Sequence, residues 1–232
     1  MVSICIRATL AQRGRIGDDA WMRAATSALL FLCLAGASPP ARSPVGHYRL
    51  VGEHDVASEL ILQADGYFQY ALAAGALDEQ AEGSWTREGD TVFLTTEPKP
   101  RPAVFAAGAT ARTSETPLNV KVIWPNGRGA ALIDLRVGFD GGEPAEGYTQ
   151  DYGWSLSPDE KRVPRWIEFA LPMYQLQSQR FTIDAAKAND LTFVLTPNDL
   201  GTVDFERLPL TIGDRELVMH RYGGELTYLI DG

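Results

Sequence analysis

Residues 58–72 read SELILQADGYFQYAL, and this pattern is the clearest structural signal in the chain. Large apolar residues recur at every second position on either side of the Asp65-Gly66 dipeptide, from Leu60 to Leu72. A period of two is typical of a strand with one buried face, and an Asp-Gly dipeptide favours a tight turn. The segment therefore predicts an antiparallel β-hairpin.

The rest of the sequence repeats this texture of short strands between turn residues. Only residues 184–189 have a pattern that would suit a helical turn. The further strands that we predict are residues 47–51, 81–87, 91–96, 119–124, 132–139, 165–171, 179–184, 191–196, 216–221 and 225–230. Many short strands separated by turns predict an all-β barrel or sandwich rather than an α/β fold.

The first strands and the last hairpin resemble parts of a lipocalin-like barrel. The residues that carry the resemblance are Gly46-x-Tyr48-x-Leu50, Leu60-x-Leu62-x-x-Asp65-Gly66-x-Phe68-x-Tyr70, Gly83-x-Trp85 and Val92-x-Leu94. Residues 217–228 resemble the closing hairpin of such barrels. Five strands are too few to close a barrel of about eight, so the resemblance implies that the C-terminal hairpin completes it.

The middle of the chain resembles a transthyretin-like or carboxypeptidase-regulatory-like β-sandwich. The residues that carry this resemblance are Val120-x-Val122, Pro125-Asn126-Gly127, Ile133-x-Leu135-x-Val137 and Tyr148-Thr149-Gln150-Asp151-Tyr152-Gly153-Trp154. Gln150 stands where that family has an aspartate. The resemblance implies a scaffold or recognition domain without chemistry of its own.

The two resemblances predict how the chain is divided. The predicted parts are a leader and signal peptide (1–37), a disordered linker (38–45), a discontinuous barrel-like domain (46–113 plus 198–232) and a transthyretin-like sandwich (114–197). A tandem of two β domains is the alternative that the sequence leaves open.

Residues 24–37 read AATSALLFLCLAGA after the positive charge of Arg23. This apolar run has the length of a signal-peptide core and is shorter than the roughly 20 residues of a membrane span. We predict cleavage after Ala37 and export to the periplasm or outside the cell, with Met22 as an alternative start to Met1. An uncleaved N-terminal anchor is the alternative. Both cysteines precede residue 38, so the predicted mature protein has no disulfide.

The formal net charge is −9, and removal of the leader makes it more negative. Phosphate backbones attract basic surfaces, so this charge argues against a nucleic-acid partner. It suits a soluble exported protein, and no transmembrane span is predicted after signal cleavage.

The sequence contains no motif typical of a metalloprotease, a serine hydrolase or a phosphate-binding loop. We predict no cofactor and no metal, because His47 and His54 could meet His220 only if the terminal hairpin lay beside the first strand. Asp78, Glu79 and Glu82 form an acidic cluster in a predicted loop. A glycan-acting acid pair needs two carboxylates facing one substrate, so this cluster leaves a glycan-acting enzyme open.

Four aromatic residues are the candidate ligand-binding residues. They are Tyr148, Tyr152, Trp154 and Trp166. Aromatic residues in turns commonly mark binding surfaces, and both sugar stacking and peptide recognition would suit them. The alternative is that Trp154 and Trp166 belong to the core of the sandwich.

These observations predict an all-β, non-enzymatic binding or assembly module of the cell envelope. Its partner would be a small molecule, a glycan or an envelope protein. One alternative is a carrier of a small apolar ligand, for which Ala71, Ala73 and Ala74 would leave room inside the barrel. A glycan-acting enzyme is the other alternative.

Overall fold

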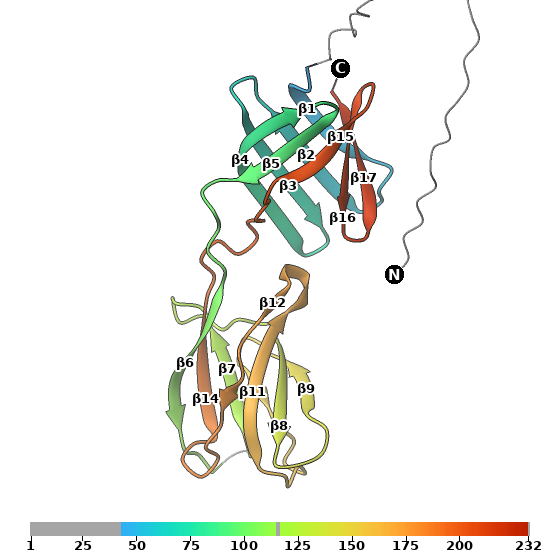
Figure 1. The fold of residues 1–232 in the computed structure, drawn as a ribbon. Helices are drawn as coiled ribbons and strands as arrows, with labels where there is room; N and C mark the ends of the chain where they lie inside the picture. The colour runs from blue at the N-terminus through green and yellow to red at the C-terminus, as the bar shows by residue number, and fades with distance from the viewer. Residues whose placement is uncertain (1–42, 115–116, 232) are drawn as a thin grey trace, which may run out of the picture. The chain divides into compact units, whose positions relative to one another are not determined.

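The computed structural model describes residues 43–114 and 117–231 (Figure 1). These residues form β-strands and one short 3₁₀ helix, η1 (Pro172–Tyr174), so the predicted all-β class is confirmed. No helix in the described ranges has the length and apolar character that crossing a membrane requires. The predicted leader and signal peptide (1–37), and residues 38–42 of the predicted linker, lie outside the described residues.

Eight antiparallel strands close into a barrel in the order β1-β17-β16-β15-β5-β4-β3-β2 (Figure 1). They are β1 (Gly46–Val51), β2 (Val56–Leu62), β3 (Tyr67–Ala74), β4 (Leu77–Glu88), β5 (Thr91–Thr96), β15 (Leu208–Ile212), β16 (Glu216–Arg221) and β17 (Gly224–Ile230). The first strand pairs with the last, since Tyr48 lies opposite Ile230. The C-terminal hairpin therefore completes the barrel.

Side chains from alternate positions fill the barrel interior. On β3, Phe68, Tyr70 and Leu72 are buried, whereas Ala71 and Ala73 are exposed. The expectation that Ala71 and Ala73 leave room inside the barrel is wrong, because side chains on a strand alternate between its two faces. The buried interior residues are Tyr48, Leu60, Leu62, Phe68, Tyr70, Leu72, Ala81, Val92, Leu94, Phe205, Leu210, Leu217, Met219, Leu226 and Tyr228.

The strands between β5 and β15 form two further sheets. One has the order β10-β7-β14-β6, and the other has the order β12-β11-β8-β9, with β13 also paired to β11. Their bounds are β6 (Val104–Ala111), β7 (Asn119–Ile123), β8 (Asp134–Phe139), β9 (Ala145–Tyr148), β10 (Trp154–Ser155), β11 (Pro164–Leu171), β12 (Leu176–Gln177), β13 (Phe181–Thr182) and β14 (Asp190–Thr196).

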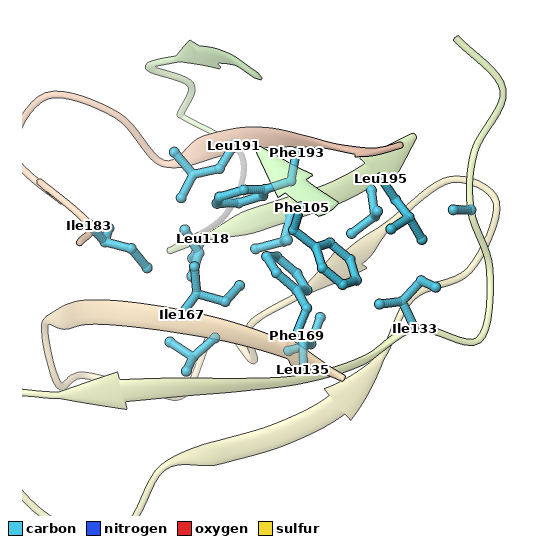
Figure 2. Packing of buried hydrophobic residues seen from close by; sticks show 14 of the residues in the cluster. Phe105, Leu118, Ile133, Leu135, Ile167, Phe169, Ile183, Leu191, Phe193 and Leu195 are labelled. Atoms are coloured by element: carbon cyan, nitrogen blue, oxygen red, sulfur yellow. The ribbon is translucent and has the colours of Figure 1, made fainter. Parts of the chain in front are cut away.

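One hydrophobic core joins these two sheets into a sandwich (Figure 2). Phe169 of β11 lies at its centre, with ring centroids 5.2 Å from Phe105 of β6 and 4.7 Å from Phe193 of β14. Figure 2 shows these rings among Leu135 and Leu195. Inward-facing apolar residues of both sheets thus pack face to face, which is how two sheets bury their apolar sides.

Strand β6 lies in the range that we predicted for the barrel, residues 46–113. It pairs instead with β14 of the sandwich, where Phe105 lies opposite Leu195. The sequence of β6, VFAAGATA, carries little alternation, because Phe105 is its only buried residue. A strand with one buried side chain lacks the alternation from which a sequence predicts a strand and the sheet to which it belongs.

Candidate recognition site

The turn before β8 displays Leu132 on the surface of the sandwich. Leu132 has a φ of 60° and is 67% exposed. A left-handed backbone is costly for a residue with a side chain, by roughly 1 kcal/mol or more. Its amide donates a hydrogen bond of 2.7 Å to the carbonyl oxygen of Thr149, which contributes to holding this conformation.

Thr149 is the buried support beneath this turn. Its side chain is fully buried, and Oγ1 donates to the carbonyl oxygen of Ala130 at 2.6 Å while accepting from the amide of Ile133 at 3.2 Å. The amide of Thr149 donates to the carbonyl oxygen of Ile133 at 2.9 Å. One threonine therefore fixes the backbone on both sides of Leu132.

Two of the predicted binding residues lie close to this support in the sequence. Tyr148 immediately precedes Thr149, pairs with Asp134 across β8 and β9, and is 53% exposed. Tyr152 is 78% exposed in a turn closed by two hydrogen bonds between Gln150 and Gly153, at 3.0 and 2.9 Å. Leu132, Tyr148 and Tyr152 thus supply large apolar groups that the fold exposes; we call these three residues the loop-end triad.

A charged network continues from Tyr148 along the outer face of the same sheet. Glu168 on β11 has a side chain that is only 7% exposed, although it faces away from the sandwich core. Arg136 donates to one carboxylate oxygen at 3.0 Å and Arg180 to the other at 2.9 Å. Arg136 also donates to Glu146 at 3.1 Å. Two guanidinium groups therefore offset the buried carboxylate, and their own side chains stay about half exposed.

Trp166 lies at the other end of this outer face. It pairs with Gly138 of β8, and a side chain at Gly138 would fall within 1.9 Å of the indole ring. The guanidinium of Arg180 lies 4.0 Å from the ring centroid. Trp166 is therefore held between Gly138 and Arg180, which leaves its ring faces less available to a ligand than those of Tyr148.

Trp154 has a packing role instead. It is half-buried on β10, lies against the sandwich core, and its indole nitrogen would be 2.3 Å from a side chain placed at Gly147. The four predicted aromatic residues are thus separated by the fold. Tyr148 and Tyr152 are exposed, Trp166 is clamped on the outer face, and Trp154 packs against the core.

A shallow groove of about 480 Å³ runs over this face beside Tyr148. Its polar lining groups are Asp134, Arg136, Glu146, Glu168 and Gln177. Tyrosine and arginine are among the side chains that most often contribute binding energy at protein interfaces. The groove and the loop-end triad together can therefore offer apolar contact flanked by both signs of charge.

The barrel holds a second arginine–glutamate cluster, which faces inward. Arg221 of β16 donates to Glu79 of β4 at 2.8 Å and to the hydroxyl of Tyr70 at 2.9 Å. The side chains of Arg221 and Glu79 are only 13% and 10% exposed. The hydroxyl of Tyr222 donates to the same carboxylate. This cluster connects strands from opposite sides of the barrel. Its charged and polar groups are hydrogen-bonded to one another.

The tyrosines around this cluster are held in their neutral form. Burial raises the pKa of Tyr70, of Tyr228 and of Tyr222, and the hydrogen bond to Glu79 raises that of Tyr222 further. On the outside of the barrel, the hydrogen bond to Glu82 raises the pKa of Tyr67. A phenol that stays neutral can donate to a carboxylate, so these shifts fit a structural network.

The acidic cluster that we predicted in a loop lies on strand β4 instead. Glu79 faces the interior, whereas Asp78 and Glu82 face solvent, since neighbouring residues on a strand point to opposite faces. The carboxylate of Glu79 accepts a hydrogen bond from Arg221, and that of Glu82 accepts one from Tyr67. The three carboxylates do not face one common substrate position.

The three histidines do not form a common site either. His47 on β1 contacts Asp231 at 3.0 Å and Glu59 at 3.3 Å, each through a different ring nitrogen. His54 and His220 are exposed. Across the described ranges 43–114 and 117–231, no group of three or more His, Cys, Asp or Glu residues has the arrangement of a metal site.

Sequence reasoning found Tyr148 and Tyr152 but missed Leu132, Arg136 and Glu168. An available signal was the acidic residue in RWIEFAL (165–171), because a carboxylate within an apolar strand needs a basic partner. Leu132 gave no signal, since nothing in its side chain indicates a left-handed backbone.

Comparisons with models of protein families, with curated proteins and with solved structures find no match. The fold and the site define the class of this chain as an all-β protein with a closed antiparallel barrel and a two-sheet sandwich.

Proposed function

We propose that this chain is an exported, non-enzymatic recognition module that binds a protein of the cell envelope through the loop-end triad and the adjoining groove. The observation that carries the proposal is Leu132, which is exposed and held in a left-handed conformation. A fold gains no burial from such a residue, and backbone strain of this kind concentrates at functional sites.

The composition of the surface favours a protein partner over a sugar. Both tryptophans, which have the broadest stacking faces, are engaged within the fold: Trp166 lies between Gly138 and Arg180, and Trp154 packs against the core. Tyr148 shares the groove with the half-exposed Arg136, and the exposed Leu132 adds an apolar side chain. Protein interfaces use such a mixture of apolar and charged contacts.

The barrel serves as the scaffold in this proposal. Its interior is filled by buried side chains, which supports a structural role over that of a ligand carrier. The closed order of eight strands supports the lipocalin-like resemblance of residues 46–94 and 217–228, and the two-sheet core supports the transthyretin-like resemblance of the middle segment. Both resemblances remain fold analogies, which alone do not define a function.

The test is photo-crosslinking in the native cell envelope. A photoreactive phenylalanine analogue replaces Tyr148 in one variant and Leu229 in a control, because Leu229 is also exposed, at 41%, but lies on a regular barrel strand, β17. We expect a covalent adduct with another protein from position 148 and none from position 229.

Two results would refute the proposal. The absence of any protein adduct from position 148 would show that the loop-end triad does not bind a protein. Equal adducts from both positions would show non-specific proximity rather than recognition. Each variant is first checked for wild-type unfolding by urea, so that misfolding is not read as a loss of binding.

A further inference from the structure

Strand β6 carries a second surface, which the proposed function does not use. β6 (Val104–Ala111) lies at the end of its sheet and pairs with β14 on one side (Figure 1). Among residues 43–114 and 117–231, no strand pairs with its other side. An end strand leaves alternate backbone N–H and C=O groups free to pair with another strand.

The side chains of β6 do nothing to block such pairing. Phe105 anchors the strand in the sandwich core, and the seven other residues are exposed. The sequence VFAAGATA contains no charged residue and no proline. Natural proteins usually protect an end strand with lysine, proline or short length, so eight uncharged residues, seven of them exposed, stand out.

The other ends of the two sandwich sheets are protected by comparison. β10 and β12 have two residues each, and β9 has four, including the charged Glu146. The barrel is closed and has no end strand. β6 has one irregularity, a bulge where its pairing with β14 shifts between Leu191 and Phe193. The described part of the chain thus offers one long end strand that is protected by neither charge nor proline.

We infer that β6 binds an extended, uncharged segment of another protein, which adds to the sheet as a further strand. Main-chain hydrogen bonds supply the affinity in this mode of recognition, so small side chains suffice on the receiving strand. The alanines and Gly108 let a partner backbone and its larger side chains approach closely.

Charge favours this occupant over a second copy of the chain. Each copy carries a formal net charge of −9, which opposes the approach of two copies. An extended, uncharged segment avoids this repulsion, because it brings no second acidic body to the contact.

The test is photo-crosslinking from Val104, which is half-exposed at the start of β6. Two further substitutions at the exposed Ala107 are compared in this background. Ala107→Lys introduces the charge that protects natural end strands, whereas Ala107→Ser keeps the strand small and neutral. Urea unfolding first establishes that both variants fold as the parent does.

We expect an adduct with another protein that Ala107→Ser retains and that Ala107→Lys lowers about tenfold or more. The crosslinked segment, made as a synthetic peptide, should slow hydrogen exchange of the β6 amides in the purified protein. An adduct at twice the chain mass, a crosslink within the chain, an adduct insensitive to Ala107→Lys, or no adduct would each overturn the inference.

Discussion

Arginine–glutamate contacts occur in both halves of this fold, but on opposite faces of their sheets. In the barrel, Arg221 and Glu79 lie inside and are almost fully buried. In the sandwich, Arg136 and Glu168 lie on the outer face, and the arginine is about half exposed. An arginine–glutamate contact is therefore part of the barrel interior in one domain and lines a surface groove in the other.

This difference separates stability from recognition. A buried ion pair is costly to break, because the remaining charge loses its partner without gaining water. A half-exposed arginine keeps its solvation and can exchange partners. Substitutions in the barrel cluster should therefore destabilise the protein, whereas those at the loop-end triad should affect binding with little loss of stability.

The largest effect is expected from Arg221→Ala. It leaves Glu79 buried without a countercharge, and we expect the free energy of unfolding to fall by about 3–5 kcal/mol in urea denaturation. A double variant, Arg221→Met with Glu79→Leu, should recover much of this loss because no charge remains buried. A loss below about 1 kcal/mol for the single variant would show that solvent reaches the pair.

The barrel tyrosines predict a loss of stability at high pH. The pKa of Tyr70 is raised above its ordinary value of 10 by burial, and that of Tyr228 is raised in the same direction. The unfolded chain releases these protons first, so the stability is complete below about pH 10 and falls as the pH rises above it. Urea unfolding at about pH 9 and pH 11 measures the effect.

Tyr70→Phe is the control for this pH dependence. The variant lacks one of the raised groups, so the slope of stability against pH should be smaller than in the wild type. Identical slopes for the two proteins would assign the alkaline loss to other groups.

A smaller effect is expected on the outer face of the sandwich from Gly138→Ala. The new methyl group would lie 1.9 Å from the Trp166 ring, which must move from its place beneath Arg180. Overpacking of this kind costs about 1–3 kcal/mol, measured by thermal unfolding with tryptophan fluorescence. Gly141→Ala is the matched control with no atom within 4 Å, and an equal loss there would mean that Trp166 does not matter.

The smallest expected difference in the free energy of unfolding is between substitutions of two equally exposed tyrosines. Tyr222→Phe removes a hydrogen bond to Glu79 and should cost about 1 kcal/mol, whereas Tyr148→Phe should cost less than about 0.5 kcal/mol. Urea midpoints of the two variants measure the difference. Equal losses would indicate that exposure alone determines the cost.

Much of the barrel was predictable because its turns are marked in the sequence. Asp65-Gly66 lies between two strands that pair as the hairpin prediction requires, and large apolar residues alternate along β3. The residues of β6 were not predicted as a strand and were placed in the barrel range, because their small side chains carry no alternation that would indicate a partner strand.

The candidate site was less predictable than the fold. Tyr148 and Tyr152 were found from residue type, but Glu168 needs Arg136 and Arg180, which lie on different segments of the chain. Glu79 was expected in a loop with Asp78, and the strand period separates them. The three-dimensional fold, and not the local sequence, determines which of these charges meet.

The most direct test of this division between stability and recognition is Leu132→Gly, measured for unfolding and for crosslinking from position 148. Glycine relieves the left-handed strain, so we expect stability to be unchanged or raised by up to about 1 kcal/mol, while the adduct with the partner protein is lost. Reduced stability with an unchanged adduct would contradict the division, because Leu132 would then serve packing rather than recognition.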